Sequence, residues 1–284
     1  MHLLDLPREL LSYIIHFADP DTLRALCLTE KRTLHTVALD LLQRNVTVRL
    51  GPDQKSTPNI SSFEAEHLAA IRSLSIIVDG FSDLGATSLS SVLGSMVNIT
   101  HIRVSGGSGT FLRLVLENTK RSELGTLELD QCDAEPQDFS NMAGISIRDL
   151  RIARCHANVR FLLGPVTVVN LEVHGVGLDG ECMHIGLTLR RLTDAHLGQL
   201  RTLCLIGTCC DAGCRDLLHM VCAFERPFSS LEELILDIPL SNDIHRKLMQ
   251  LLPAFPVLKN CHVFSRHNED SLSMCFLLFL YRSG

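Results

Sequence analysis

The cysteines of the C-terminal half have the residue type, and in part the spacing, of metal ligands. The chain has 11 cysteines in 284 residues, and five of them fall close together: Cys204, Cys209, Cys210, Cys214 and Cys222. Zinc sites usually combine two pairs of thiol or imidazole ligands on loops that converge. Cys209 and Cys210 have no second pair, and Cys214 and Cys222 lie on an apolar stripe of helical spacing. We therefore expect buried, reduced thiols and predict no metal and no other cofactor.

A second group combines carboxylates with imidazoles in one long spacer: Asp179, Glu181, His184, Asp194 and His196. Such side chains can transfer protons or hold a metal ion. No nucleophile elbow, His-Glu-x-x-His or Cys/His signature accompanies them, so solvated loop residues are the interpretation that we favour. The sequence predicts no catalytic residue, and an enzyme that uses the insertion from Leu178 to Cys214 is kept as an alternative.

A glycine-rich stretch, Gly106-Gly107-Ser108-Gly109-Thr110, precedes the apolar run from Phe111 to Leu116. A helix that begins at such a loop can bind phosphate. The stretch lacks the Lys-Ser/Thr of a P-loop and the G-x-G-x-x-G spacing, so we predict a turn between a strand and a helix.

These candidate residues lie within a sequence repeat, and the fold of that repeat must determine their positions. Its unit is an aliphatic residue, two variable residues, an aliphatic residue, one variable residue and an aliphatic residue. Copies begin 21 to 32 residues apart, and the last is weak because Cys261 takes its middle place: Ile71-Leu74-Ile76, Ile99-Ile102-Val104, Leu124-Leu127-Leu129, Ile147-Leu150-Ile152, Val168-Leu171-Val173, Leu200-Leu203-Leu205, Leu231-Leu234-Leu236 and Leu258-Cys261-Val263.

Each unit predicts a short strand with one apolar face, which only stacked copies can bury. Amphipathic segments lie between the units, and the clearest have these apolar positions: Leu89, Val92, Leu93 and Met96; Cys214, Leu217, Leu218, Val221 and Cys222; Ile244, Leu248, Leu251 and Leu252. The spacers after Leu129 and Ile152 are shorter, which favours partial turns or 3₁₀ segments. The predicted fold class is therefore α/β, and a doubly wound α/β domain is the alternative.

The units resemble irregular leucine-rich repeats over residues 71–264. The resemblance implies a solenoid with parallel strands on the concave side and helices outside. Cys132 and Cys155 follow their units where such repeats use Asn or Cys to reach the backbone of the turn. The variable positions of the strands are the candidates for substrate binding: Arg103, Glu128, Arg151, Glu172 and Glu232.

The N-terminal fifty residues predict three short helices. Pro7 suits a first helical turn, and Leu10, Leu11, Ile14 and Ile15 follow at helical spacing. Pro20 begins a second helix that carries Leu23, Leu26 and Cys27, and Thr29 precedes a third that carries Leu34, Val37, Ala38 and Leu41. So small a core leaves apolar surface available to a partner.

This pattern resembles the F-box. The residues that carry the resemblance are Leu6-Pro7-x-Glu9-Leu10-Leu11, Ile14-Ile15, Phe17 and Thr22-Leu23-x-Ala25-Leu26-Cys27-Leu28. The tail at residues 41–48 is similar to the segment that closes fungal members. The resemblance implies a substrate-recognition subunit of an SCF-type cullin-RING ubiquitin ligase that carries no catalysis itself. It also implies docking to a Skp-family adaptor through these residues: Leu6, Pro7, Glu9, Leu10, Leu11, Ile14, Ile15, Leu23 and Leu26. A leucine-rich-repeat scaffold that is not linked to ubiquitination is the alternative.

Composition sets the remaining expectations. The formal net charge of −6 argues against nucleic-acid or anionic-membrane partners, and the hydrophobic content of 46% is enough for a sizeable core. The N-terminus has no signal-peptide pattern, so we expect a cytoplasmic or nuclear protein. Residues 271–281 predict an apolar helix that caps the solenoid. The predicted organisation is an F-box at 1–50, a connector at 51–70 with a short helix at its end, repeats at 71–264 and a capping segment at 265–284.

Overall fold

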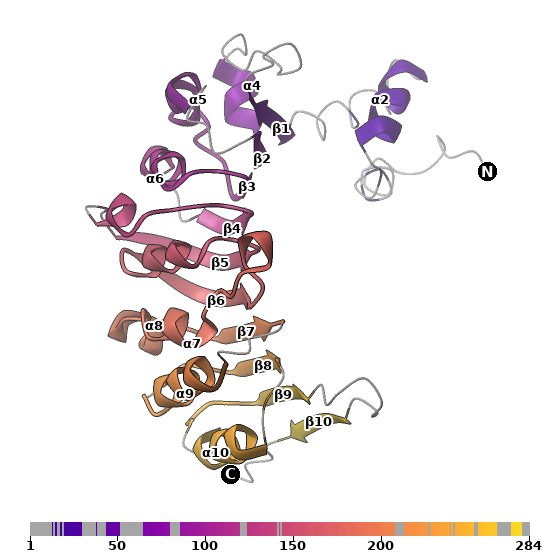
Figure 1. Cartoon of the computed structure of the whole chain (residues 1–284). Helices are drawn as coiled ribbons and strands as arrows, with labels where there is room; N and C mark the ends of the chain where they lie inside the picture. Colours follow the sequence, from indigo (N-terminus) through magenta and orange to yellow (C-terminus); the bar gives the residue numbers. More distant parts are fainter. Residues whose placement is uncertain are drawn as a thin grey trace, which may run out of the picture.

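Ten strands form one sheet in which every strand pairs with the next strand in the sequence (Figure 1). The structure, a computed structural model, describes residues 13, 15, 18, 20–29, 38, 44–51, 65–79, 86–119, 124–140, 142, 144–207, 213–226, 228–238, 240, 242–252, 255–265 and 274–279. The strands are β1 (Asn45–Leu50), β2 (Ser73–Val78), β3 (His101–Ser105), β4 (Leu124–Asp130), β5 (Ile145–Ala153), β6 (Val166–His174), β7 (Thr202–Ile206), β8 (Glu233–Asp237), β9 (Asn260–Ser265) and β10 (Met274–Phe279). Strands β1 to β9 are parallel, and β10 is antiparallel to β9.

Helices cover one face of this sheet. They are α4 (Ala65–Ala70), α5 (Ala86–Leu93), α6 (Gly109–Asn118), the 3₁₀ helices η4 (Pro136–Phe139) and η5 (Ala157–Leu163), α7 (Ile185–Leu189), α8 (Asp194–Gln199), α9 (Gly213–Phe224) and α10 (Asn242–Leu251). A third 3₁₀ helix, η6 (Leu178–Gly180), lies in the connection that follows the carboxyl end of β6 and has no buried residue. Successive helices stack along one side of the strands in Figure 1. The predicted α/β class, with a parallel sheet on one side and helices on the other, is confirmed. The predicted short helix in the connector is confirmed as α4, and the predicted 3₁₀ segments after β4 and β5 are confirmed as η4 and η5.

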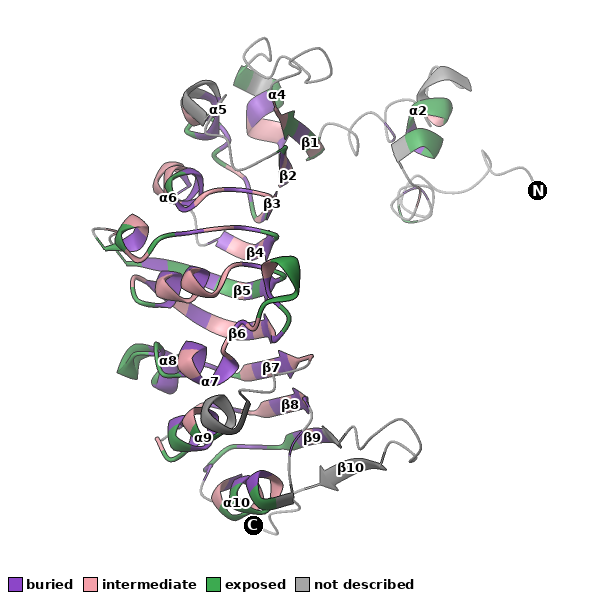
Figure 2. Cartoon of the chain, in the orientation of Figure 1, coloured by how far each residue is buried: buried purple, intermediate pink, exposed green. Residues whose placement is uncertain are grey.

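Rows of aliphatic side chains hold the sheet to the helices. One row runs in register through the middle positions of the repeat: Leu74, Ile102, Leu127, Leu150, Leu171, Leu203, Leu234 and Cys261. All eight are at most 2% exposed, and Figure 2 shows the buried residues between the two layers. Stacking therefore places every unit of the repeat in one continuous core, as the spacing predicts.

The helical stripes follow the predictions with one exception. Leu89, Val92, Leu93 and Met96 are buried at α5, and Ile244, Leu248 and Leu252 are buried at α10. On α9, however, Leu218 and Cys222 are exposed, while Met220, Val221, Ala223 and Phe224 are buried. The predicted stripe of α9 is therefore confirmed at Val221 and wrong at Leu218 and Cys222, and the side chains of Cys214 and Leu217 lie outside the described residues. Nearly every residue in the second half of this helix is apolar, so the sequence pattern cannot select one face.

The turns after the strands explain the glycine run and two of the cysteines. Gly106 follows β3 with φ +81°, and Ser108 then caps α6 by accepting a hydrogen bond from the Phe111 amide at 3.1 Å. The Cys132 thiol donates to the Val104 carbonyl at 3.5 Å, and the Cys155 thiol donates to the Ala153 carbonyl at 3.2 Å. The predicted glycine turn and the predicted thiol-to-backbone contacts are confirmed.

Both ends of the sheet differ from the predicted boundaries. Residues 45–50, predicted as the end of the F-box, form β1 and pair with β2. Val48 is 1% exposed and extends the buried rows by one strand. At the other end the predicted capping helix is a strand, because β10 pairs antiparallel with β9. The alternation of Val46 and Val48 fits a strand, and a capping strand satisfies the edge of β9.

Part of the N-terminal head is described. The predicted second helix is confirmed as α2 (Pro20–Thr29), which begins at the predicted proline. Ile15, Leu23 and Ala38 are at most 6% exposed and lie apart from the core of the sheet, whereas Leu26 is half-buried. The motif residues Leu6, Pro7, Glu9, Leu10, Leu11 and Ile14 lie outside the described residues. Among the described residues, no helix combines the length and apolar character needed to cross a bilayer.

Candidate functional site: the exposed face of the sheet

The sheet face opposite the helices carries charged side chains in register. The variable residue between the last two aliphatic positions of each unit points to this face, since side chains alternate along a strand. Register aligns these residues across β2 to β9 in one row: Ser75, Arg103, Glu128, Arg151, Glu172, Cys204, Ile235 and His262. At its centre, the row alternates guanidinium and carboxylate groups over four neighbouring strands.

Short ion pairs order the centre of this row. Arg151 Nε lies 3.0 Å from Glu172 Oε1, and His174 Nε2 lies 2.7 Å from the same oxygen. The basic side chains around Glu128 are farther away, with Arg103 Nε and His101 Nε2 each at 3.9 Å. Exposed pairs of this kind contribute about 0–1 kcal/mol each. Their main effect is to fix the orientations of the side chains on the face.

A stronger cluster lies where β4 ends. Arg154, at φ 52° after β5, donates two hydrogen bonds to the Asp130 carboxylate, and Arg103 Nη2 lies 3.5 Å from Asp130 Oδ2. Asp130 is 7% exposed, and its hydrogen bond raises the pKa of Arg154. The bidentate pair connects the ends of β4 and β5 and borders a hollow of about 160 Å³.

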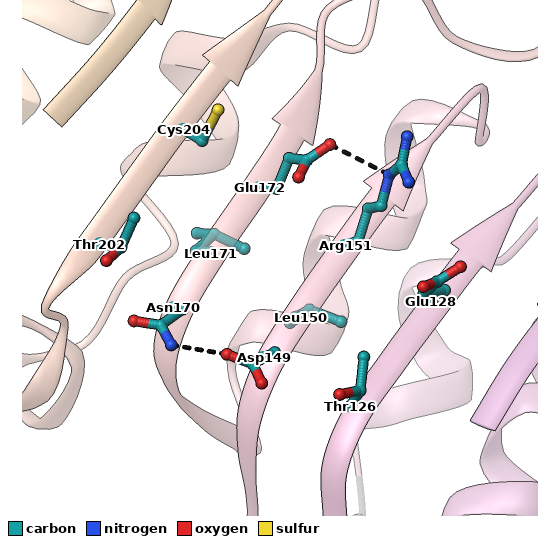
Figure 3. A pocket seen from close by; sticks show the side chains of 10 residues that line it. All are labelled: Thr126, Glu128, Asp149, Leu150, Arg151, Asn170, Leu171, Glu172, Thr202 and Cys204. Carbon is teal, nitrogen blue, oxygen red and sulfur yellow. Dashed lines mark hydrogen bonds and ion pairs between the residues drawn. The ribbon is translucent and has the colours of Figure 1, made fainter. Parts of the chain in front are cut away.

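A larger hollow, of about 270 Å³, lies over β4 to β7. Figure 3 shows its walls: Thr126 and Glu128 on β4, Asp149 and Arg151 on β5, Asn170 and Glu172 on β6, and Thr202 and Cys204 on β7, with Leu150 and Leu171 completing the floor. The Asn170 amide donates to Asp149 Oδ1 at 2.6 Å. Polar side chains that converge on a hollow can fix the orientation of a ligand.

Four of the five predicted substrate-binding residues lie side by side on this face: Arg103, Glu128, Arg151 and Glu172. The prediction that Glu232 lies in a strand is wrong. Glu232 precedes β8, and its carboxylate pairs with Lys259 Nζ at 2.7 Å, a hydrogen bond that lowers the pKa of Glu232. Sequence reasoning missed Asp130, Asp149, Asn170 and Cys204. The same two-residue alternation would have placed Asp149, Asn170 and Cys204 on the face.

Cys204 lies in the hollow, and its environment suppresses its reactivity. Burial, then the negative charges of Glu172, Glu233 and Asp237, raises the pKa of Cys204 to about 11, against the opposing charge of Arg151. A thiol needs its thiolate form to react, so this shift removes about 99% of the thiolate relative to an ordinary thiol at neutral pH.

Alkylation should therefore distinguish Cys204 from the exposed Cys222. We expect iodoacetamide at pH 8 to modify the half-buried Cys204, whose thiolate is disfavoured, more slowly than the exposed Cys222, measured by mass spectrometry of the peptides. Glu172→Gln should accelerate the reaction of Cys204, because it removes one of the charges that disfavour the thiolate. Equal rates at the two cysteines would contradict this electrostatic description.

The acid and imidazole residues of the long spacer are distributed over three elements. Asp179 lies in η6 and Glu181 follows it, both exposed, while His184 precedes α7. The interpretation of His196 as a solvated loop residue is wrong, because His196 is buried in α8, where its Nδ1 accepts a hydrogen bond from the Thr193 amide at 3.1 Å. Among the described residues, no three His, Cys, Asp or Glu side chains are arranged to hold a metal ion. Cys209 and Cys210 lie outside those residues.

His196 predicts a pH dependence of stability. Burial lowers the pKa of His196, and the charge of Arg226 adds to this effect while the Val166 carbonyl opposes it. The unfolded chain therefore binds a proton below pH 6.5 that the folded chain does not bind, so the free energy of unfolding falls as pH falls. We expect a loss of up to about 1.4 kcal/mol per pH unit between the unfolded and folded pKa values.

The matched variant is His196→Asn, whose side-chain oxygen can replace Nδ1 as the acceptor for Thr193. Urea unfolding of both proteins from pH 7.5 to pH 5 isolates the contribution of His196 as the difference between the two curves. The difference should shrink toward low pH. A difference that is independent of pH would show that His196 does not titrate differently in the two states.

Comparisons with known proteins give little further information. No protein-family model and no curated protein matches this sequence. Among solved structures, a Bacteroides fragilis protein from a structural genomics programme matches with 13% identity and a TM-score of 0.34, over 76% of this chain and 70% of its own. A likeness at this level indicates neither a shared fold nor a shared function.

Proposed function

We propose that this chain is the substrate-recognition subunit of an SCF-type cullin-RING ubiquitin ligase. In this proposal an F-box at the N-terminus docks to a Skp-family adaptor, and a leucine-rich-repeat sheet binds the substrate protein. The observation that carries the proposal is the exposed face of the sheet, where rigid parallel strands present alternating charges around a hollow. A face of this kind provides many polar contacts for a protein partner.

The head supports the adaptor contact through its sequence. Helix α2 begins at Pro20, and Ile15 and Leu23 are buried, which supplies a small core of the kind an F-box needs. Buried side chains are not available to a partner. We therefore assign adaptor docking to the other motif residues: Leu6, Pro7, Glu9, Leu10, Leu11, Ile14 and the half-buried Leu26.

Co-purification with a purified Skp-family adaptor tests this proposal. The wild-type chain should bind the adaptor, and a Leu6→Asp/Leu10→Asp variant should lose binding because charges replace apolar docking groups. Arg24→Ala is the matched control, since Arg24 is exposed on α2 and pairs with Asp21 of the same helix at 2.7 Å. Circular dichroism would verify that the sheet is intact in each variant.

Two results would contradict the ligase role: no binding by the wild-type chain, or equal binding by the wild-type chain and the double variant. In either case the sheet face would remain a candidate interaction surface. The protein would then be better described as a repeat scaffold without a link to ubiquitination.

A further inference from the structure

The charges that line the 270 Å³ hollow are unbalanced. Its ten lining residues include three carboxylates, Glu128, Asp149 and Glu172, but one guanidinium, Arg151. That guanidinium is already paired, because Arg151 Nε lies 3.0 Å from Glu172 Oε1 (Figure 3). The hollow therefore carries an excess of negative charge that its own arginine does not neutralise.

The carboxylates also have unused capacity to accept hydrogen bonds. The Arg103 guanidinium and the His101 imidazole each approach Glu128 no closer than 3.9 Å, beyond hydrogen-bond distance. Asp149 receives a hydrogen bond from Asn170 at Oδ1, and both close partners of Glu172 lie on Oε1. An ionised carboxylate has about four lone-pair sites, so each of these three groups can accept further donors.

The Cys204 thiol on one wall of the hollow lies near Glu172, which lines the hollow, and near Glu233 and Asp237, which do not. Its pKa is raised by burial first and then by three carboxylates, while Arg151 opposes them only in part. The potential at this wall is therefore negative. A cation that enters the hollow would be attracted to it, and an anion would be repelled.

The size and geometry of the hollow favour an organic cation carried by a protein. Pockets for drug-sized ligands are about 300–1,000 Å³, so this hollow lies just below that range. No three ligating side chains of the described residues are arranged for a metal ion. A guanidinium or ammonium group offers several N–H donors to separate carboxylates, and its aliphatic stem can lie against the Thr126 and Thr202 methyl groups.

We propose that the hollow over β4 to β7 receives a lysine or arginine side chain from a segment of the protein partner. This inference rests on the proposed role of the sheet face as the partner-binding surface, and it specifies the chemistry of that partner. Glu128 and Asp149 bind the cationic head, Glu172 contributes with its second oxygen, and Asn170 holds Asp149 in place. Arg151 competes with the incoming cation for Glu172.

Selection from a random peptide library displayed on phage tests this inference. The immobilised full-length chain should enrich peptides that contain Arg or Lys, and the same selection on a Glu128→Gln/Asp149→Asn variant should lose that enrichment. Synthetic copies of the enriched peptides should bind the double variant at least about tenfold more weakly, since charged hydrogen bonds are removed. Arg151→Gln should bind these peptides several-fold more tightly, because it removes the internal competitor.

Glu117→Gln is the matched control, because Glu117 is a partly exposed carboxylate on α6, on the helical side of the sheet, and pairs with Arg113 at 3.0 Å. It should leave peptide binding unchanged. A wild-type selection without basic enrichment, or equal enrichment on the double variant, would overturn the inference. Adaptor binding depends on the N-terminal motif, so loss of the adaptor contact with retained basic selection would reject the ligase role alone.

Discussion

Replacing Gly106 by alanine is expected to lower the free energy of unfolding by about 3 kcal/mol, because two separate costs add at this position. Gly106 has φ +81°, and a Cβ at this position would overlap the carbonyl oxygen of Val78 on the neighbouring strand. A positive φ costs an alanine about 1–2 kcal/mol, and overlap in a packed region adds about 1–3 kcal/mol. Urea denaturation followed by circular dichroism measures the change.

Two other glycines separate these contributions. Gly180 has φ +80°, but a methyl group at its Cα would meet open space, so Gly180→Ala should cost about 1 kcal/mol from the backbone conformation alone. Gly94 has neither a positive φ nor a neighbour within 4 Å of the position that a Cβ would take, so Gly94→Ala should change stability by less than about 0.5 kcal/mol. If all three variants lost equal stability, the close approach of β2 to the turn after β3 would not be the cause.

Leu171→Ala is expected to lower the free energy of unfolding by about 2–5 kcal/mol. Leu171 is 1% exposed on β6, where it pairs in register with Leu150 on β5 and Leu203 on β7. Removing its side chain leaves a cavity between two stacked units, and each unit depends on its neighbours. Hydrogen exchange should therefore show lost protection at β5 to β7 before any change at β2 and β3.

Leu171→Met tests whether the lost side-chain volume, and not the changed side-chain shape, causes the loss of stability in Leu171→Ala. A methionine of similar volume should cost less than about 1.5 kcal/mol, because it refills most of the space. Equal losses for both variants, or a loss of protection spread evenly over all strands, would contradict the description of the core as a stack of local contacts.

The sheet was predictable from the sequence because its core residues repeat. The aliphatic pair that ends each unit, such as Leu127 and Leu129, fixes both the strand and the buried face, and register follows from stacking. The position of β1 was not predictable from the repeat. Val46 and Val48 match the last two aliphatic positions of the unit, but Gln43 stands where the first aliphatic residue would be. The phase of α9 was hidden by its largely apolar composition.

The candidate site was predictable only where the strand geometry determines it. The single variable residue before the last aliphatic position of each unit faces away from the helices. This rule identified Glu128, Arg151 and Glu172 as residues of the exposed face. Two variable residues separate the first and second aliphatic positions, and only the second lies on the face. Glu233 thus occupies the position that corresponds to Thr202, whereas Glu232 lies before the strand. The Asp130–Arg154 pair depends on a left-handed turn that the sequence pattern does not reveal.

We propose that this one chain joins a Skp-family adaptor to a partner with a basic segment. A bridging assay tests it most directly: a basic peptide selected on the sheet face is mixed with the chain and passed over immobilised adaptor, and the retained peptide is measured. We predict retention with the wild-type chain and with Glu117→Gln, and loss with Leu6→Asp/Leu10→Asp and with Glu128→Gln/Asp149→Asn. Retention of the peptide by the Leu6→Asp/Leu10→Asp variant, or its absence with the wild-type chain, would contradict the account.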